Sequence, residues 1–133
     1  IKKIFSLPVV PDVSISVVGV QDVAEAHVMA MENENANGKR FLLSEKTIKL
    51  KDLSNILKSA GFKKVPTFVI PNFLLKFVAL FTPSLKMIAK RLGKEEKLYT
   101  TNANNILGWY PNRVELEIIN SAKQLYETGL LKN

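Results

Sequence analysis

The 133-residue chain contains no cysteine and only one histidine, His27. The absence of cysteine excludes a disulfide framework, a thiolate nucleophile and a zinc site with sulfur ligands. A single histidine among sparse carboxylates does not make a metal site either. We therefore expect no bound metal and a reducing compartment, the cytoplasm.

Long hydrophobic runs are absent as well. No apolar stretch approaches the roughly 18 residues that a membrane-spanning helix needs, and the first residues, Ile1 to Phe5, lack the apolar core of a signal peptide. These absences predict no membrane partner. Because Ile1 stands where a complete chain has its initiator methionine, we expect a piece of a longer protein.

Glycine is sparse and widely spaced, with no two glycines closer than fifteen residues. A phosphate-binding loop needs clustered glycines, because only glycine lets the backbone approach a pyrophosphate. The spacing excludes a dinucleotide-binding fingerprint and the phosphate loop of nucleotide hydrolases. We expect no cofactor-binding residue in this chain.

The chain is rich in apolar residues and positive charge. Hydrophobic residues make up 47% of the sequence, which suffices for the core of one domain spanning residues 1–133. The net charge is +7, and residues 39–97 alone carry 14 basic and 4 acidic groups. Such a segment attracts polyanions, although lysines on the solvated faces of helices explain the charge more simply.

The hydrophobic periodicity predicts an α/β chain, mostly helical with a few short strands. The strongest helix signal runs from Leu50 to Ala60, where apolar residues recur at helical spacing and Gly61 follows at the stop position. Further helices are expected at residues 23–31, 71–82, 84–92, 102–107 and 113–128, strands at 13–18 and 40–44, and an extended stretch at 65–70.

Several side chains on these predicted helices are candidates for chemistry. Asp22 and Glu25 resemble a capping box, which places the start of the first long helix at Val23. His27 lies on that helix, and we interpret it as a packed or helix-surface residue rather than an acid or base.

Phe73, Phe77 and Phe81 form a stripe at helical spacing. The stripe suits a lipid-like or flavonoid-like pocket, but a core or an interface between lobes is the favoured interpretation.

Motifs in both halves of the chain point to one family. The run Val18-Gly19-Val20-Gln21-Asp22-Val23-Ala24 is similar to the strand-to-helix motif Val-Asp-Val-Arg-Asp-Val-Ala of the extended short-chain dehydrogenases/reductases, the NAD-dependent epimerase/dehydratase family. Two departures lie inside it, because Gly19 replaces an aspartate and Gln21 replaces an arginine.

The remaining motifs follow in register over about residues 8–131. Gly38 to Ser44, followed by a helix, resembles the family's returning strand. Ile70-Pro71-Asn72 with Leu80 and Pro83 resembles the dihydroflavonol-reductase-like subgroup. Ala103 to Pro111 resembles Lys-Ala-x-x-x-Leu-Gly-Trp-x-Pro, with Asn102 where lysine is common.

The resemblance implies the C-terminal, substrate-binding part of a Rossmann-type enzyme whose N-terminal dinucleotide-binding domain is absent from this chain. NAD or NADP is implied for the intact enzyme. The family's proton donor is a tyrosine four residues before a lysine, yet the residues four positions after Tyr99, Tyr110 and Tyr126 are alanine, valine and leucine. We therefore expect no catalytic residue here and no activity in isolation.

The resemblance also suggests roles for single residues. Gln21, Phe68 and Phe73 are expected to line the substrate pocket, Gln21 because the family's arginine at this position helps tie the lobes or faces the substrate. Asp22, Gly108, Trp109 and Pro111 are expected to be structural. The indole N–H of Trp109 needs a partner if the ring is buried.

Three functions remain open at this point. The leading one is the substrate-binding part of an NAD(P)-dependent reductase or epimerase for a carbonyl or hydroxyl compound, with the dinucleotide-binding domain and a small-molecule substrate as partners and some self-association. The alternative is a non-enzymatic binding module that uses residues 39–97 for nucleic acid or a regulatory partner. Nucleic acid is less favoured, because no basic helix carries interleaved base-stacking aromatics. A pure oligomerisation domain is the third.

Overall fold

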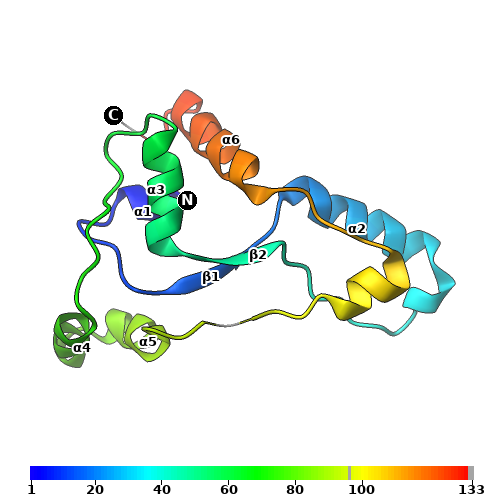
Figure 1. Ribbon diagram of the computed structural model, residues 1–133, viewed down its shortest axis with the longest axis horizontal. Helices are drawn as coiled ribbons and strands as arrows, with labels where there is room; N and C mark the ends of the chain where they lie inside the picture. Colours follow the sequence, from blue (N-terminus) through cyan, green and yellow to red (C-terminus); the bar gives the residue numbers. More distant parts are fainter. Residues whose placement is uncertain (96, 132–133) are drawn as a thin grey trace. The chain divides into compact units, whose positions relative to one another are not determined.

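The computed structural model describes residues 1–95 and 97–131 (Figure 1). Helices dominate the described residues, and the two strands β1 and β2 pair into a small sheet, a content compatible with an α/β fold. In chain order the elements are α1 (Lys2–Phe5), β1 (Ser14–Val17), α2 (Val20–Glu32), the 3-10 turn η1 (Glu34–Ala36), β2 (Lys46–Lys49), α3 (Leu50–Ser59), α4 (Asn72–Phe81), α5 (Pro83–Arg91), the π-helical turn η2 (Ala103–Leu107) and α6 (Val114–Glu127).

The chain divides into two compact units, each assembled from segments distant in sequence. Unit 1 comprises Ile1–Ile15, Ile48–Glu95 and Glu115–Asn133, and unit 2 comprises Ser16–Thr47 and Glu96–Val114. Each unit has its own cluster of buried apolar side chains. The predicted single lobe of residues 1–133 therefore contains two centres of packing.

The core of unit 1 gathers around Val13, Leu75 and Leu92, all less than a tenth exposed. Ile70 and Ile88 pack against this cluster from either side of α4. Within the stretch expected to be extended, residues 65–70, Val69 forms a parallel bridge with Val10. The inner side of the α4 and α5 hairpin is thereby fixed to the first segment of the chain.

The core of unit 2 consists of Ala26, Ala103 and Trp109, with Phe41 and Leu43 packed against them. Ala26 comes from α2, and Ala103 begins η2. Because these segments are more than 70 residues apart, the cluster holds the front and the back of the chain together.

The second strand lies later in the chain than the sequence pattern predicts. We expected it at residues 40–44, but the structure forms β2 at Lys46–Lys49. The amide of Glu45 donates to the carbonyl of Val17 at 2.8 Å, and the amide of Leu50 donates to that of Val13 at 3.0 Å. The residue numbers rise along β2 while those of their partners in β1 fall, so the two strands are antiparallel.

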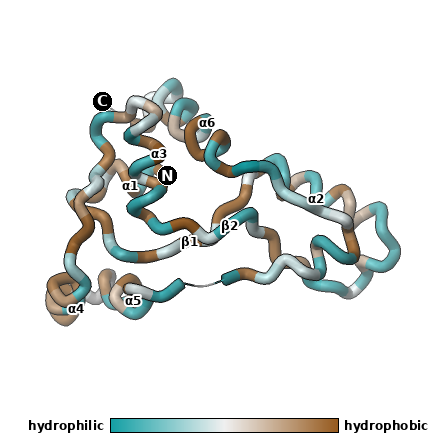
Figure 2. The backbone as a smooth tube through the Cα atoms, in the orientation of Figure 1, coloured by the Kyte–Doolittle hydropathy of each residue, from teal (hydrophilic) through white to brown (hydrophobic). Residues whose placement is uncertain are grey.

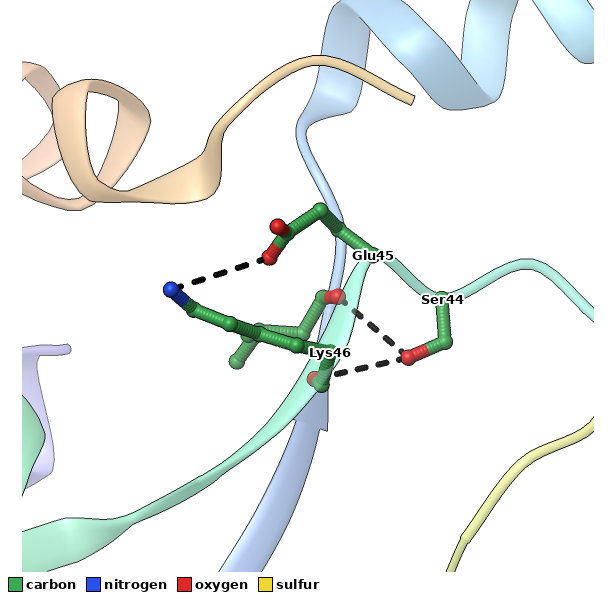
Figure 3. A network of polar contacts seen from close by, with 4 residues as sticks. Ser44, Glu45 and Lys46 are labelled. Carbon is green, nitrogen blue, oxygen red and sulfur yellow. Dashed lines mark hydrogen bonds and ion pairs between the residues drawn. The ribbon is translucent and has the colours of Figure 1, made fainter. Parts of the chain in front are cut away.

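Residues 40–44 contribute packing instead of strand hydrogen bonds, which is the physical reason for the shift. Phe41 and Leu43 pack on the Trp109 core, while Ser44, only 7% exposed, begins the turn into β2. The Ser44 hydroxyl lies 3.5 Å from the carbonyl oxygen of Val17 and 3.4 Å from that of Lys46 (Figure 3). Next to it, the ammonium of Lys46 lies 4.0 Å from the carboxylate of Glu45.

Several helix predictions are confirmed. The Leu50 helix is observed as α3, and Gly61 after it has the positive φ of +96° that favours glycine. Helices at α4, α5 and α6 also lie within a few residues of their expected positions. The segment expected as a helix at 102–107 is wound as a π-helical turn over Ala103–Leu107.

The predicted capping box at Asp22 is wrong. Helix α2 begins three residues earlier than expected, at Val20, and Gly19 at its N-cap provides no side-chain hydrogen bond. Asp22 lies inside the first turn, where its carboxyl group is used by a distant segment.

None of the helices in the described residues is both long and apolar enough to cross a membrane.

Candidate functional site

Trp109 is the most completely buried large side chain of unit 2, with 0% of its surface exposed. A buried indole needs a hydrogen-bond acceptor, and its Nε1 donates to the carbonyl oxygen of Asp22 at 2.8 Å. This bond joins residues 87 positions apart in the sequence. Trp109 therefore fixes the first turn of α2 against the segment that follows η2.

The carboxyl group of Asp22, in a residue 2% exposed, completes the attachment. Its Oδ1 accepts from Nδ2 of Asn112 at 2.7 Å and from the backbone amide of the same residue at 3.2 Å. We refer to Asp22, Trp109 and Asn112 as the Trp109 cluster. Two of its three bonds use backbone groups, so its chemistry is that of a structural joint.

The turn η2 shapes the approach to this cluster. Gly108 has a left-handed φ of +69°, and the amide of Trp109 donates back to the carbonyl of Ala103 at 3.1 Å. Asn104 accepts from the Thr100 hydroxyl at 2.9 Å and donates to the carbonyl of Trp109 at 2.8 Å. Both ends of its amide are therefore occupied, and the backbone at residues 103–109 is tightly held.

A surface hollow of about 420 Å³ opens in unit 2, lined by Arg40, Leu42, Tyr99, Thr101 and Asn102. The side-chain amide of Asn102 donates to the carbonyl of Arg40 at 3.2 Å, which closes one side of the hollow. A guanidinium, a phenol and a hydroxyl remain on its lining. Such groups suit a ligand that carries hydroxyl or phosphate oxygens.

A smaller hollow of about 160 Å³ lies beside the single histidine and is lined by Ala26, His27, Ala30, Phe41, Leu43 and Leu107. His27 is on the exposed surface of α2, and its Nδ1 lies 2.7 Å from the carbonyl oxygen of Val23. One ring nitrogen is thus used within the helix. The other polar groups needed for acid or base chemistry are missing from this apolar lining.

The residues expected to line a substrate pocket are all exposed. Phe68 and Phe73 in unit 1 are 68% and 75% exposed, and Gln21 is exposed on α2 in unit 2. The hollows described above are lined by other residues. The assignment of Gln21, Phe68 and Phe73 to substrate stays a prediction.

The aromatic stripe on α4 was expected in a core or at an interface. The core alternative is wrong, because Phe73, Phe77 and Phe81 are 75%, 60% and 76% exposed. Leu75 and Ala79 occupy the buried side of this helix instead.

No cluster of histidine, aspartate and glutamate side chains able to hold a metal ion occurs among residues 1–95 and 97–131.

Comparison with known proteins gives evidence for the fold. No protein-family model matches the chain, and no curated protein matches its sequence. Among solved structures, the protein gox2253 is similar over 98% of this chain, with a TM-score of 0.77 and 19% identity. A nucleoside-diphosphate-sugar epimerase from Staphylococcus aureus is similar over 88% of this chain, with a TM-score of 0.55 and 18% identity.

The chain spans less than half of either solved structure, 43% of gox2253 and 45% of the epimerase. At these identities the similarity shows the fold alone. The fold of this chain is thus one that occurs as a part of larger proteins.

Sequence reasoning identified Trp109 and Asp22 but missed their partner. Asn112 lies 90 residues from Asp22, and no local pattern signals such a pairing. Arg40 and Tyr99 were also missed as neighbours, because they come from segments almost 60 residues apart. The unusual concentration of asparagine at residues 102–105 was the one available signal of a tightly hydrogen-bonded turn.

Proposed function

We propose that this chain is the substrate-binding part of an NAD(P)-dependent reductase or epimerase that acts on a carbonyl or hydroxyl compound. The observation that carries the proposal is the partial coverage of two solved structures, gox2253 (98% of this chain, 43% of the other) and a nucleoside-diphosphate-sugar epimerase (88% and 45%). The cofactor and the catalytic pair belong, in this proposal, to a separate dinucleotide-binding domain.

The distribution of glycine and tyrosine supports this division of labour. The chain has no clustered glycines and no lysine four residues after a tyrosine, so it lacks the groups that would hold a pyrophosphate and transfer a proton. The enzyme's chemistry would be supplied elsewhere, and this part would select and orient the compound that reacts. In isolation it is inactive.

Within this part, the hollow lined by Arg40, Tyr99 and Thr101 is the proposed contact with a polar ligand. A guanidinium binds phosphate through two parallel hydrogen bonds, and a phenol ring offers a stacking surface. A sugar phosphate is therefore a suitable probe, because it has neither the pyrophosphate nor the nicotinamide of the cofactors. Its binding should weaken at least about tenfold in Arg40→Ala, as expected for loss of a charge-assisted contact. Arg113→Ala, at another exposed arginine of unit 2, is the matched control.

Cofactor binding tests the proposal itself. NADH and NADPH are titrated into the 133-residue chain and into the protein in its natural full length, and nicotinamide fluorescence is followed. The isolated chain should give no saturable signal, and the full-length protein should bind one of the two cofactors.

The genetic context gives an independent check. The coding sequence upstream of Ile1 should encode a glycine-rich loop between a strand and a helix, and a tyrosine four residues before a lysine. An upstream sequence without both features would refute the proposal.

A further inference from the structure

The outer face of the α4 and α5 hairpin is an exposed apolar surface with a basic border. Its apolar side chains are Phe73, Phe77, Leu80, Phe81 and Met87, each at least 60% exposed. Phe77 and Phe81 contact each other edge to face, with ring centroids 5.6 Å apart. Figure 2 shows α4 coloured mostly as hydrophobic. We call this surface the hairpin face.

Lysines border the hairpin face. Lys76, Lys86 and Lys90 are exposed. Together with Ala79, Leu80 and Ala89 they line a hollow of about 360 Å³. The charge is of one sign over a long stretch, because residues 53–94 contain eight lysines and arginines and no aspartate or glutamate. Long lysine side chains can lie along an apolar surface while their ammonium groups reach outward.

The hairpin is firmly attached to unit 1 by its other side. Leu75 and Leu92 belong to the buried cluster around Val13. The side-chain amide of Asn72 donates to Asp12 at 3.2 Å, and the amide of Gly93 donates to the carbonyl of Asp12 at 2.9 Å. Asp12 thus holds the beginning of α4 and the residues after α5. The buried leucines of the hairpin, Leu75 and Leu92, are different from the exposed residues of the hairpin face.

We propose that the hairpin face docks on the surface of a membrane that contains anionic lipids. Aromatic and aliphatic side chains on one side of a short helix enter the boundary between headgroups and acyl chains, and surrounding lysines are attracted to anionic headgroups. Such an association lies in the plane of the membrane and needs no spanning helix. The absence of long apolar runs argues against a membrane-spanning helix, not against this kind of surface association.

Charge selects this occupant over the main competitors. If a second copy covered the hairpin face, two borders of lysines would face each other, and like charges oppose such a contact. A nucleic acid would use the lysines but would leave the helical stripe of phenylalanines unused. An anionic membrane uses both features. This inference stands on α4 and α5 and does not depend on the proposed enzymatic function.

Vesicle sedimentation tests the proposal with the full-length protein and with the 133-residue chain. The vesicles contain either phosphatidylcholine alone or phosphatidylcholine with about a third phosphatidylserine, a content that gives the surface a negative potential. Both proteins should bind the anionic vesicles at low salt, bind neutral vesicles much more weakly, and lose affinity as salt is added.

Two double variants separate the apolar and the basic contributions. F77S/F81S should weaken vesicle binding at least about tenfold, and K86E/K90E should weaken it at least about 25-fold, since each lysine near an anionic surface contributes about fivefold. Leu116→Ser, at a residue of α6 that is 67% exposed, controls for the loss of an exposed apolar side chain. K51E/K123E, at exposed lysines of α3 and α6, controls for net charge. Both controls should bind like the unaltered protein, and circular dichroism should show all variants folded.

Four outcomes would overturn the proposal. The first is no binding to anionic vesicles at low salt. The second is vesicle binding that F77S/F81S leaves unchanged while random DNA binds as tightly, since the surface would then be a polyanion site. The third is self-association in sedimentation velocity that F77S/F81S abolishes, without vesicle binding. The fourth is vesicle binding by the 133-residue chain but not by the full-length protein. In that case the rest of the protein would cover the hairpin face.

Discussion

The Trp109 cluster of unit 2 and the hairpin face of unit 1 use aromatic residues in opposite ways. Trp109 is fully buried and its one polar atom is paired with Asp22. Phe77 and Phe81 are mostly exposed, on the same helix as the exposed Lys76. An aromatic side chain with a complete set of internal contacts stabilises the fold, whereas an exposed row of them is typical of an interaction surface.

The largest effect is expected at Trp109. Trp109→Ala should lower the free energy of unfolding by about 3–5 kcal/mol, because it leaves a large cavity and removes the indole hydrogen bond to the carbonyl of Asp22. Denaturant unfolding is followed by circular dichroism, because Trp109 is the one tryptophan of the chain and the variant loses tryptophan fluorescence as a probe. Tyr110→Ala, at a neighbour that is 73% exposed, should change stability by less than about 1 kcal/mol. Equal effects at the two positions would contradict the structural role of Trp109.

The two sides of α4 should differ next. Leu75→Ala should cost about 2–4 kcal/mol, because Leu75 is 8% exposed within the unit 1 core. Phe77→Ala should cost less than about 1 kcal/mol, because Phe77 is 60% exposed. Urea denaturation of both variants gives the comparison. A larger loss at Phe77 than at Leu75 would show that the hairpin face is packed within this chain.

The carboxyl group of Asp22 should have an intermediate effect. Asp22→Ala removes the acceptor of two hydrogen bonds from Asn112 and should cost about 1.5–3 kcal/mol. Glu25→Ala, at an exposed carboxylate of the same helix, should cost less than about 0.5 kcal/mol. Thermal unfolding of the two variants tests whether Asp22 stabilises the fold through its hydrogen bonds to Asn112 or only through its negative charge near the start of α2. If both variants unfold at the same temperature, Asp22 does not hold Asn112.

The smallest effect concerns the backbone at Gly108. No atom lies within 4 Å of a Cβ added there, so Gly108→Ala should cost only the strain of a left-handed φ, about 1–2 kcal/mol. Gly108→Asn should lose less, since asparagine tolerates this conformation better. A chemical denaturation series that ranks asparagine below alanine would contradict the turn geometry.

The sequence predicted the elements with strong local signals. The Leu50 helix with Gly61 after it needs only periodicity and a stop residue, and both are local. The strand at 40–44 was misplaced because its apolar residues Phe41 and Leu43 pack on Trp109, a contact that hydrophobicity alone does not distinguish from strand burial.

The candidate site was harder to predict than the fold, because its contacts are long-range. Asp22 was recognised as structural, but its pairing with Asn112 crosses 90 residues, and the local Glu25 gave a misleading capping signal. The phenylalanine stripe on α4 was interpreted as part of a core or of an interface between lobes, because its spacing is the same as that of a buried face. Only the structure shows that Leu75 and Ala79 take the buried side.

Cofactor binding by the 133-residue chain decides whether the chain is the substrate-binding part of a larger enzyme. We expect no saturable binding of NADH or NADPH to this chain, and binding of one of them to the full-length protein through its dinucleotide-binding domain. Saturable binding of either cofactor to the 133-residue chain alone would contradict it.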